Sequence, residues 1–413
     1  MRRNPFTFIP LLVLTLTGAA VAHGADYRLT QALTIMEEFN DNIYESRRDR
    51  KADLITRLSP KIGFNYADPL WRWDMDYSPE YRNYARGTHG DQLLQNFHAD
   101  GTVRLINNFL FLSVSDSYTQ APLDGNRSSL FTDQTNQNIF RISPYIQYRL
   151  DPRWTMNSGY RYLNRHYSYS DSIDNQEHGL FLKGTRELSS RASLFMDLDY
   201  ARVYTSNNTA HERLTHTIGS QYRYAVGSAL TTEGGYSILF PSTGGSKFSP
   251  YWNIGLIHIW KSYTFSLNSG VSYDTETGLT ASERRALNGR LVKAYRRSSL
   301  ALFGSYNETL NSQTRAASSR WFTMGTDATY DISRRATAHA LIATDSYLGR
   351  AAELYRNSFT AGIRYDLYYD LFTGLDYNRI AHSNTAFSPT GPIEVNRIMV
   401  YLTKSFGAPL FAR

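Results

Sequence analysis

The sequence predicts an all-β protein: a closed, antiparallel transmembrane β-barrel of about 20 strands. Three observations support this fold class: a secretory leader, segments in which apolar and charged residues alternate, and turn signals that separate those segments. The clearest segment runs from Trp71 to Arg82, and its strict alternation gives one face for lipid and one for water. Its apolar positions are Trp71, Trp73, Met75, Tyr77, Pro79 and Tyr81, and the others are Arg72, Asp74, Asp76, Ser78, Glu80 and Arg82.

The N-terminus has the pattern of a signal peptide. Arg2-Arg3 supplies the positive start, residues 6–17 form the apolar core, and small residues before and at Ala22 form a cleavage site. We therefore expect residues 1–22 to be removed, with cleavage as late as Ala25 as the alternative. A membrane anchor is disfavoured because the apolar run is short.

Composition supports a barrel for the remaining residues, 26–413. The chain has 31 Tyr, 21 Phe and 6 Trp, yet it has no later apolar run of the length that a spanning helix needs. Aromatic residues without apolar runs are typical of barrels with aromatic belts at both membrane interfaces. The chain has no cysteine, which excludes disulfides and thiolate metal sites.

Tight and loose connections alternate along the chain, as expected for short periplasmic turns and longer outer loops. Nine tight turns and ten loose segments predict twenty strands with both termini on the periplasmic side; miscounted hairpins would lower the number to as few as 16. Few residues precede the first strand, so we expect no plug domain. The tight turns are predicted at residues 68–69, 107–108, 151–153, 189–191, 227–228, 261–262, 296–297, 333–335 and 368–370.

Some predicted strands conflict with the simple pattern. The segments Ala336–Tyr347 and Asn108–Tyr118 lack a clean two-residue period. Pro60, Pro79 and Pro144 fall inside predicted strands, where each costs a ladder hydrogen bond unless it lies at a bulge or a strand end.

The residues opposite the apolar faces are the predicted lining of a wet lumen. Mixed charge there can serve hydration and bracing between strands. Four arginines of one predicted hairpin have no acid on the same face, so they could also favour anions; a purely structural ladder is the alternative. The candidate pore-lining residues are Arg72, Asp74, Asp76, Glu80, Arg82, Arg141, Arg149, Arg161 and Arg165.

The longest predicted loop, Thr119–Gln137, is the candidate for a constriction. Its apolar residues Leu123, Leu130 and Phe131 could pack inside the barrel. The alternative is a surface loop with ordinary hydrophobic contacts.

No catalytic, metal or cofactor site is predicted. The sequence His211–His216 resembles a zinc helix motif, but its second histidine comes one residue too late. His98 and Asp100 could touch on one strand face, and Asp274 and Glu276 could bind calcium weakly; structural pairing and a solvated loop are the simpler interpretations. The sequence also contains no phosphate-binding or nucleic-acid motif, so we predict neither an enzyme nor a nucleic-acid-binding protein.

The N-terminal part of the barrel resembles a known family. The segments that carry the resemblance are Leu33–Tyr44, Asp53–Ile62, Trp73–Tyr77 and Tyr81–Ala85. They look like the opening of outer-membrane β-barrel porins associated with bacterial exopolysaccharide and PEP-CTERM loci. The resemblance covers residues 33–118 and implies an outer-membrane conduit for a secreted polysaccharide or a related surface polymer.

The resemblance assigns no functional residue, and Asp41-Asn42 is most simply a turn former. The resemblance implies that the protein contacts outer-membrane lipid and periplasmic polysaccharide-export proteins. The oligomeric state stays open. Two alternatives remain: a general or anion-preferring diffusion porin, and a sleeve around a partner such as a multihaem cytochrome. An outer-membrane phospholipase or protease is the disfavoured fourth class.

Overall fold

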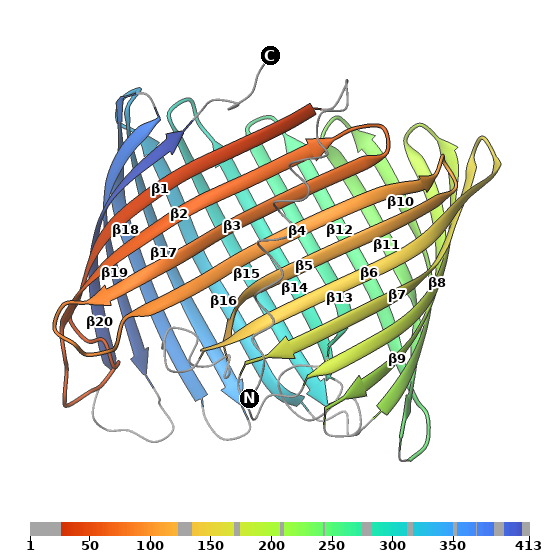
Figure 1. Cartoon of the computed structure of the whole chain (residues 1–413), viewed down its shortest axis with the longest axis horizontal. Coiled ribbons are helices and arrows are strands. Elements are labelled where there is room, and N and C mark those ends of the chain that lie inside the picture. The colour runs from red at the N-terminus through yellow and green to blue at the C-terminus, as the bar shows by residue number, and fades with distance from the viewer. Residues whose placement is uncertain are drawn as a thin grey trace.

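A computed structural model describes the chain in ten ranges: 26–122, 134–168, 174–206, 210–242, 244–274, 282–311, 317–349, 353–368, 370–383 and 392–406. These ranges contain twenty strands, which Figure 1 shows as the staves of one barrel. The predicted leader lies outside the described residues. The strands are β1 (Asp26–Asn40), β2 (Asp53–Ala67), β3 (Trp71–Tyr84), β4 (Gln92–Ile106), β5 (Leu110–Pro122), β6 (Gln134–Asp151), β7 (Trp154–Tyr167), β8 (Asn175–Ser189), β9 (Ala192–Thr205), β10 (Ala210–Ala225), β11 (Ser228–Pro241), β12 (Lys247–Trp260), β13 (Tyr263–Asp274), β14 (Ser282–Ala294), β15 (Ser298–Asn311), β16 (Ala317–Asp331), β17 (Ala336–Gly349), β18 (Glu353–Tyr368), β19 (Leu371–Ser383) and β20 (Ile393–Phe406).

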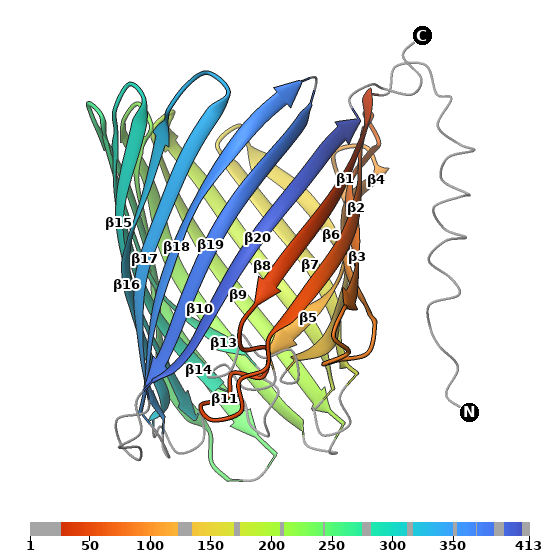
Figure 2. The same ribbon diagram turned by 90° about the vertical axis from the view of Figure 1, so that its left-hand side faces the viewer.

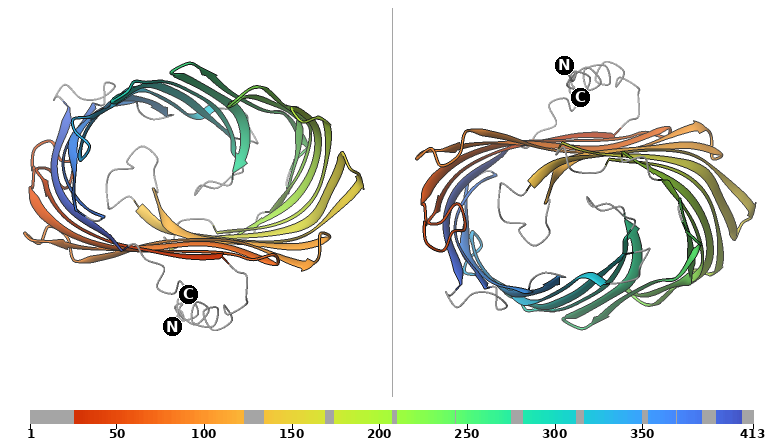
Figure 3. Two further views of the ribbon diagram at one scale, coloured as in Figure 1. Left: turned by 90° about the horizontal axis from the view of Figure 1, so that it is seen from above. Right: turned by 90° about the horizontal axis from the view of Figure 1, so that it is seen from below.

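Each strand pairs antiparallel with its neighbours in sequence, and β1 pairs with β20 to close the ring. The predictions of an all-β, closed antiparallel barrel and of twenty strands are therefore confirmed. The tight connections gather at one end, here called the turn end, and the longer ones at the other, the loop end (Figures 1 and 2). Seen along its axis, the ring is elongated and flattened along β1 to β5 (Figure 3).

A repeated side-chain device closes several tight turns. At the β2–β3 turn, the Asp68 carboxylate accepts hydrogen bonds from the backbone N–H groups of Leu70 and Trp71, both at 2.6 Å. The Tyr66 hydroxyl donates to the same carboxylate and holds the pKa of Asp68 below its usual value. Turns of this kind are local Asx or Ser turns, which explains why the sequence shows them. The same pattern occurs at Asp151, Ser189 and Ser333.

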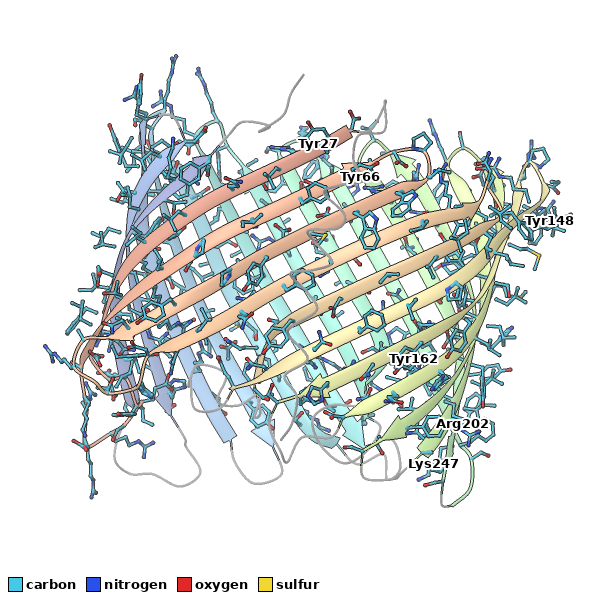
Figure 4. All side chains as sticks on the ribbon, viewed as in Figure 1. Tyr27, Tyr66, Tyr148, Tyr162, Arg202 and Lys247 are labelled. Carbon is cyan, nitrogen blue, oxygen red and sulfur yellow. The ribbon has the colours of Figure 1, made fainter. Side chains whose placement is uncertain are left out.

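The outer face of the barrel carries large apolar side chains. Ile218 and Trp260 are about 60% exposed, as suits a surface that contacts lipid. Figure 4 marks Tyr27, Tyr66 and Tyr148 near the turn end and Tyr162 toward the loop end. Aromatic residues near both ends are typical of the belts that the composition predicts.

The structure corrects one expectation about a loop. The segment Asn108–Tyr118, which lacks a clean two-residue period, still forms a strand, because β5 begins at Leu110 after the predicted turn, in which Asn108 has φ of 57°. The predicted loop Thr119–Gln137 is wrong at both ends, since β5 continues to Pro122 and β6 begins at Gln134. These ends pair with each other and extend the hairpin. Leu123, Leu130 and Phe131 lie outside the described residues.

Pro60 and Pro79 are tolerated because the N–H groups that they lack would fall at the same gap in the β2–β3 pairing. Pairing between β2 and β3 breaks between Leu58↔Tyr81 and Ile62↔Tyr77, and the constant register places Pro60 opposite Pro79 in the gap. Two missing N–H groups therefore interrupt the ladder at one position rather than two.

Candidate functional site

The predicted pore residues of β3 lie on the face opposite the exposed aromatic residues. Trp71, Tyr77 and Tyr81 are 37–40% exposed on the outer face, so the even-numbered residues of the same strand point inward. This inward set is Arg72, Asp74, Asp76, Glu80 and Arg82. Their role in transport stays a prediction.

Several of these inward charges pair across strands. Arg57 lies 3.6 Å from Glu80 and also pairs with the buried Glu38, and Glu80 also pairs with Arg82. Lys61 lies 3.4 Å from Asp76. Opposite charges in this arrangement brace the wall of β1 to β3 more than they attract a mobile ion. On β4, His98 and Asp100 meet at 2.6 Å, as a structural pair.

The arginines of β6 and β7 divide between two parts of the lumen. Arg141, Arg161 and Arg165 line one cavity of about 360 Å³, whereas Arg149 lies near the turn end, opposite Thr155. We name this space the loop-end cavity. Its lining consists of Arg141, Arg161, Leu163, Arg165, Asn175, Glu177, Val203, His211, Arg213, Ser237, Leu239, Ser249, Ser272 and Tyr273.

Acids from the neighbouring strands pair with one arginine of the predicted ladder. Arg161 donates to Glu177 on β8 at 3.0 Å and to Asp199 on β9 at 2.9 Å. Arg213 on β10 approaches the same Asp199 at 3.9 Å. The hairpin of β6 and β7 has no acid of its own on this face, but its neighbours hold the guanidinium of Arg161 in a fixed orientation.

Small residues make this arrangement possible. The register places Arg161 opposite Gly179, Gly179 opposite Ala201, and Ala201 opposite Arg213, in one row across four strands. A Cβ atom at Gly179 would lie 3.2 Å from the Arg161 guanidinium. The absent side chain therefore gives Arg161 room to cross the strand and reach Asp199.

The loop end of the β13–β14 hairpin forms the opposite side of the cavity. The ring of Tyr273 lies 5.5 Å from the guanidinium carbon of Arg213, although Tyr273 and the outward Phe265 are on the same face of β13. β12 and β13 pair only from Asn253↔Gly270 to Trp260↔Tyr263. Beyond Gly270 the hairpin leaves β12 and turns into the lumen, as both views in Figure 3 show.

This inward turn separates residues that alternation alone places together. Tyr263, Phe265 and Leu267 lie on the same face of β13 as Val271 and Tyr273, but Val271 is only 4% exposed and Tyr273 lines the cavity. Alternation within a strand places residues on one face of that strand. It does not show where the strand itself bends.

Residues from the segments Leu33–Tyr44 and Asp53–Ile62 form hydrogen bonds that hold neighbouring strands together at the loop end. Asp53 accepts hydrogen bonds from the backbone N–H groups of Arg86 and Thr88, so it ties β2 to the β3–β4 loop. Asp41 accepts from the backbone and side-chain nitrogens of Asn396 on β20, each at 2.7 Å. Asp41-Asn42 does more than form the expected turn, because both residues also bind β20: Asn42 donates to the backbone oxygen of Glu394 at 2.9 Å.

The two histidines of the zinc-like sequence lie on opposite faces of β10. His211 lines the loop-end cavity, whereas His216, five residues later on the same strand, faces outward and lies 5.6 Å from the ring of Tyr236. Glu276 lies outside the described residues, so the calcium interpretation is untested. In the described ranges, no group of three or more His, Asp or Glu residues could hold a metal ion. Within those ranges, no helix is long and apolar enough to cross a membrane.

The geometry defines a class of fold: a closed barrel with an apolar outer face and a polar inner one. Solved structures of outer-membrane transporters share it. The FrpB iron transporter from Neisseria meningitidis (F3-3 variant) matches with a TM-score of 0.51 and 10% identity over 91% of this chain and 82% of that one. The copper transporter OprC matches with a TM-score of 0.50 and 8% identity over 92% and 83%. At such low identity the likeness shows the fold alone. No protein-family model matches the sequence, and no curated protein matches it.

Proposed function

We propose that the chain is a passive conduit of the bacterial outer membrane that serves the export of exopolysaccharide or a related surface polymer. The observation that carries this proposal is the chemistry of the loop-end cavity, where serine hydroxyls, an amide and oriented guanidinium groups line the lumen. A hydrated sugar chain can exchange hydrogen bonds with such a wall, and covalent chemistry is not required. The resemblance of residues 33–118 supplies the polymer class and suggests periplasmic export proteins as partners.

A deletion strain tests this function directly. We expect it to secrete less polymer and to accumulate polymer in the periplasm, and a plasmid that carries the full chain should restore secretion. The amounts of other outer-membrane barrels should stay unchanged, which excludes a general assembly defect. Normal secretion by the deletion strain would overturn the proposal.

A second function is favoured by the arginines of the same cavity: an anion-preferring diffusion porin. The purified protein in a planar bilayer should then conduct steadily and show anion preference in its reversal potential. Replacing Arg141, Arg161 and Arg165 by glutamine should reduce this preference. A closed pore or a cation preference would count against it.

A further inference from the structure

We propose that the loop-end cavity is a binding site for carboxylated sugar units, so that the transported polymer is acidic. This inference rests on the proposed export function and names its substrate class. The cavity of about 360 Å³ is at the lower end of the ~300–1,000 Å³ range of ligand pockets, a size suited to one or two sugar rings at a time.

The charges around the cavity favour a carboxylate. Arg141, Arg161 and Arg213 stand against the two carboxylates of Glu177 and Asp199, which leaves an excess of positive charge. Arg141 is exposed to the lumen and, in the described part of the chain, has no carboxylate within ion-pair distance. A guanidinium group presents paired N–H donors that match the two oxygens of a carboxylate.

Arg161 is oriented for this role by its neighbours. Its Nε and Nη2 atoms donate to Glu177, and Nη2 also donates to Asp199. These bonds fix the plane of the guanidinium and leave Nη1 without a bond to any described residue. Arg161 therefore approaches a ligand with little loss of side-chain freedom on binding.

Neutral polar groups complete a surface for sugar hydroxyls. Asn175 is only 3% exposed, and its buried amide nitrogen has no hydrogen-bond partner among the described residues. A buried amide donor of this kind favours a ligand that brings an acceptor. Ser237, Ser249 and Ser272 supply hydroxyl groups elsewhere in the lining of the cavity.

The inward turn of β13 supplies the remaining wall. Tyr273 reaches the cavity only because the hairpin leaves β12 beyond Gly270. One face of its ring is covered by Arg213, and the ring provides a flat apolar surface against which the C–H groups of a sugar can pack. The site therefore combines residues of β6 to β12 with Ser272 and Tyr273 from the hairpin that turns into the lumen.

The experiment uses the purified full-length protein in a planar bilayer, with oligogalacturonate as the acidic probe and a maltooligosaccharide of equal length as the neutral one. We expect oligogalacturonate to block the ion current at concentrations at least about tenfold lower than the neutral sugar. The R141Q and R213Q variants should raise the blocking concentration about tenfold, because each removes a guanidinium of the cavity. The matched control is R149Q, because Arg149 lies on the same face of β6 but outside the cavity. Oligogalacturonate should block the R149Q variant at the same concentration as the wild type.

Equal block by both sugars would overturn the site, as would equal effects of R141Q and R149Q. Relief of the block by millimolar inorganic phosphate would also overturn it, because it would show a general anion effect. If R141Q folds poorly, the milder R141K variant replaces it. R141K keeps the charge without the paired donors, so its blocking concentration should lie between those of the wild type and R141Q.

Lost secretion in the deletion strain with no oligogalacturonate binding would refute the acidic substrate and leave the export function standing. Normal secretion would refute the export function itself.

Discussion

At the scale of single residues, a serine compensates for a proline in the middle of the wall. Pro144 has no N–H group, and β6 does not pair with β7 at Ser143 and Pro144. The constant register would place Tyr160 opposite Pro144, and the Ser143 hydroxyl donates to the Tyr160 backbone oxygen at 2.9 Å. The neighbouring side chain thus supplies the donor that proline lacks.

The S143A variant tests this compensation. It should lower the free energy of unfolding by about 1 kcal/mol, because Ser143 is buried and the Tyr160 oxygen would lose its donor. Denaturant unfolding in detergent, followed by tryptophan fluorescence, measures the change. The S113A variant is the control, since Ser113 lies opposite Ser143 on β5. Equal effects of the two substitutions would contradict the assignment.

Gly179 is a second residue with a defined role, because its missing side chain leaves space for the Arg161 guanidinium. In a G179V variant, the added methyl groups would occupy the space of the Arg161 guanidinium and move it from Asp199 and Glu177. We expect weaker block of the current by oligogalacturonate, by about tenfold, while the protein still inserts and conducts. The control is G255V, because Gly255 has its nearest neighbours at 3.9 Å. If G255V had the same effect as G179V, general strain in the wall would be the cause.

At the scale of elements, the β13–β14 hairpin changes its surroundings along its length. Phe265 and Leu267 belong to the apolar outer surface, whereas further along the same face Glu283 is 1% exposed and pairs with Arg285 at 2.7 Å. Arg285 also lies 5.8 Å from the ring of Trp252 on β12. The chemistry of the face changes from apolar to charged where the hairpin turns inward, so ion pairs and packing hold it there.

Removing the buried carboxylate should release this hairpin. In an E283A variant, Glu308 at 3.9 Å is the one acid among the described residues that stays within ion-pair distance of Arg285, and an under-compensated charge destabilises its surroundings. We expect a larger single-channel conductance and faster proteolysis within the described ends of β13 and β14. An E187A variant, which changes an exposed lumen glutamate near the turn end, should leave both unchanged. An unaltered conductance in E283A would show that this hairpin does not narrow the pore.

The strand pattern was predictable because its signals are local. Alternation and turn residues such as Asp68 and Ser333 act within a few positions of the chain, so they defined the strand number and the turn positions. The inward turn at Val271 depends on contacts with strands far away in the sequence. The pairing of Arg161 with Glu177 and Asp199 was also missed, because it depends on residues of other strands. A register drawn from the predicted turns would have placed Gly179 beside Arg161 and indicated that pairing.

At the scale of the whole molecule, the ring depends on one seam between the ends of the chain. β1 and β20 pair from Gln31↔Phe406 to Asn40↔Arg397. At the loop end of this seam, Glu38 and Glu45 lie within 4.0 Å of Arg397, and Glu45 lies 3.2 Å from His382. The segment around Glu38 and Glu45 therefore contributes to closure of the barrel.

The D41A variant tests the seam. Asp41 accepts two hydrogen bonds from Asn396, and their loss should cost about 2 kcal/mol, given that bonds to charged groups contribute ~1.5–3 kcal/mol each and Asp41 is partly exposed. The folded form should convert to the unfolded form at a lower temperature on gels run in SDS. D41N, which keeps one acceptor oxygen, should lose less. D49A removes an exposed carboxylate from the same loop and should match the wild type. If D41A and D49A unfolded at the same temperature, closure of the ring would depend on the backbone hydrogen bonds alone.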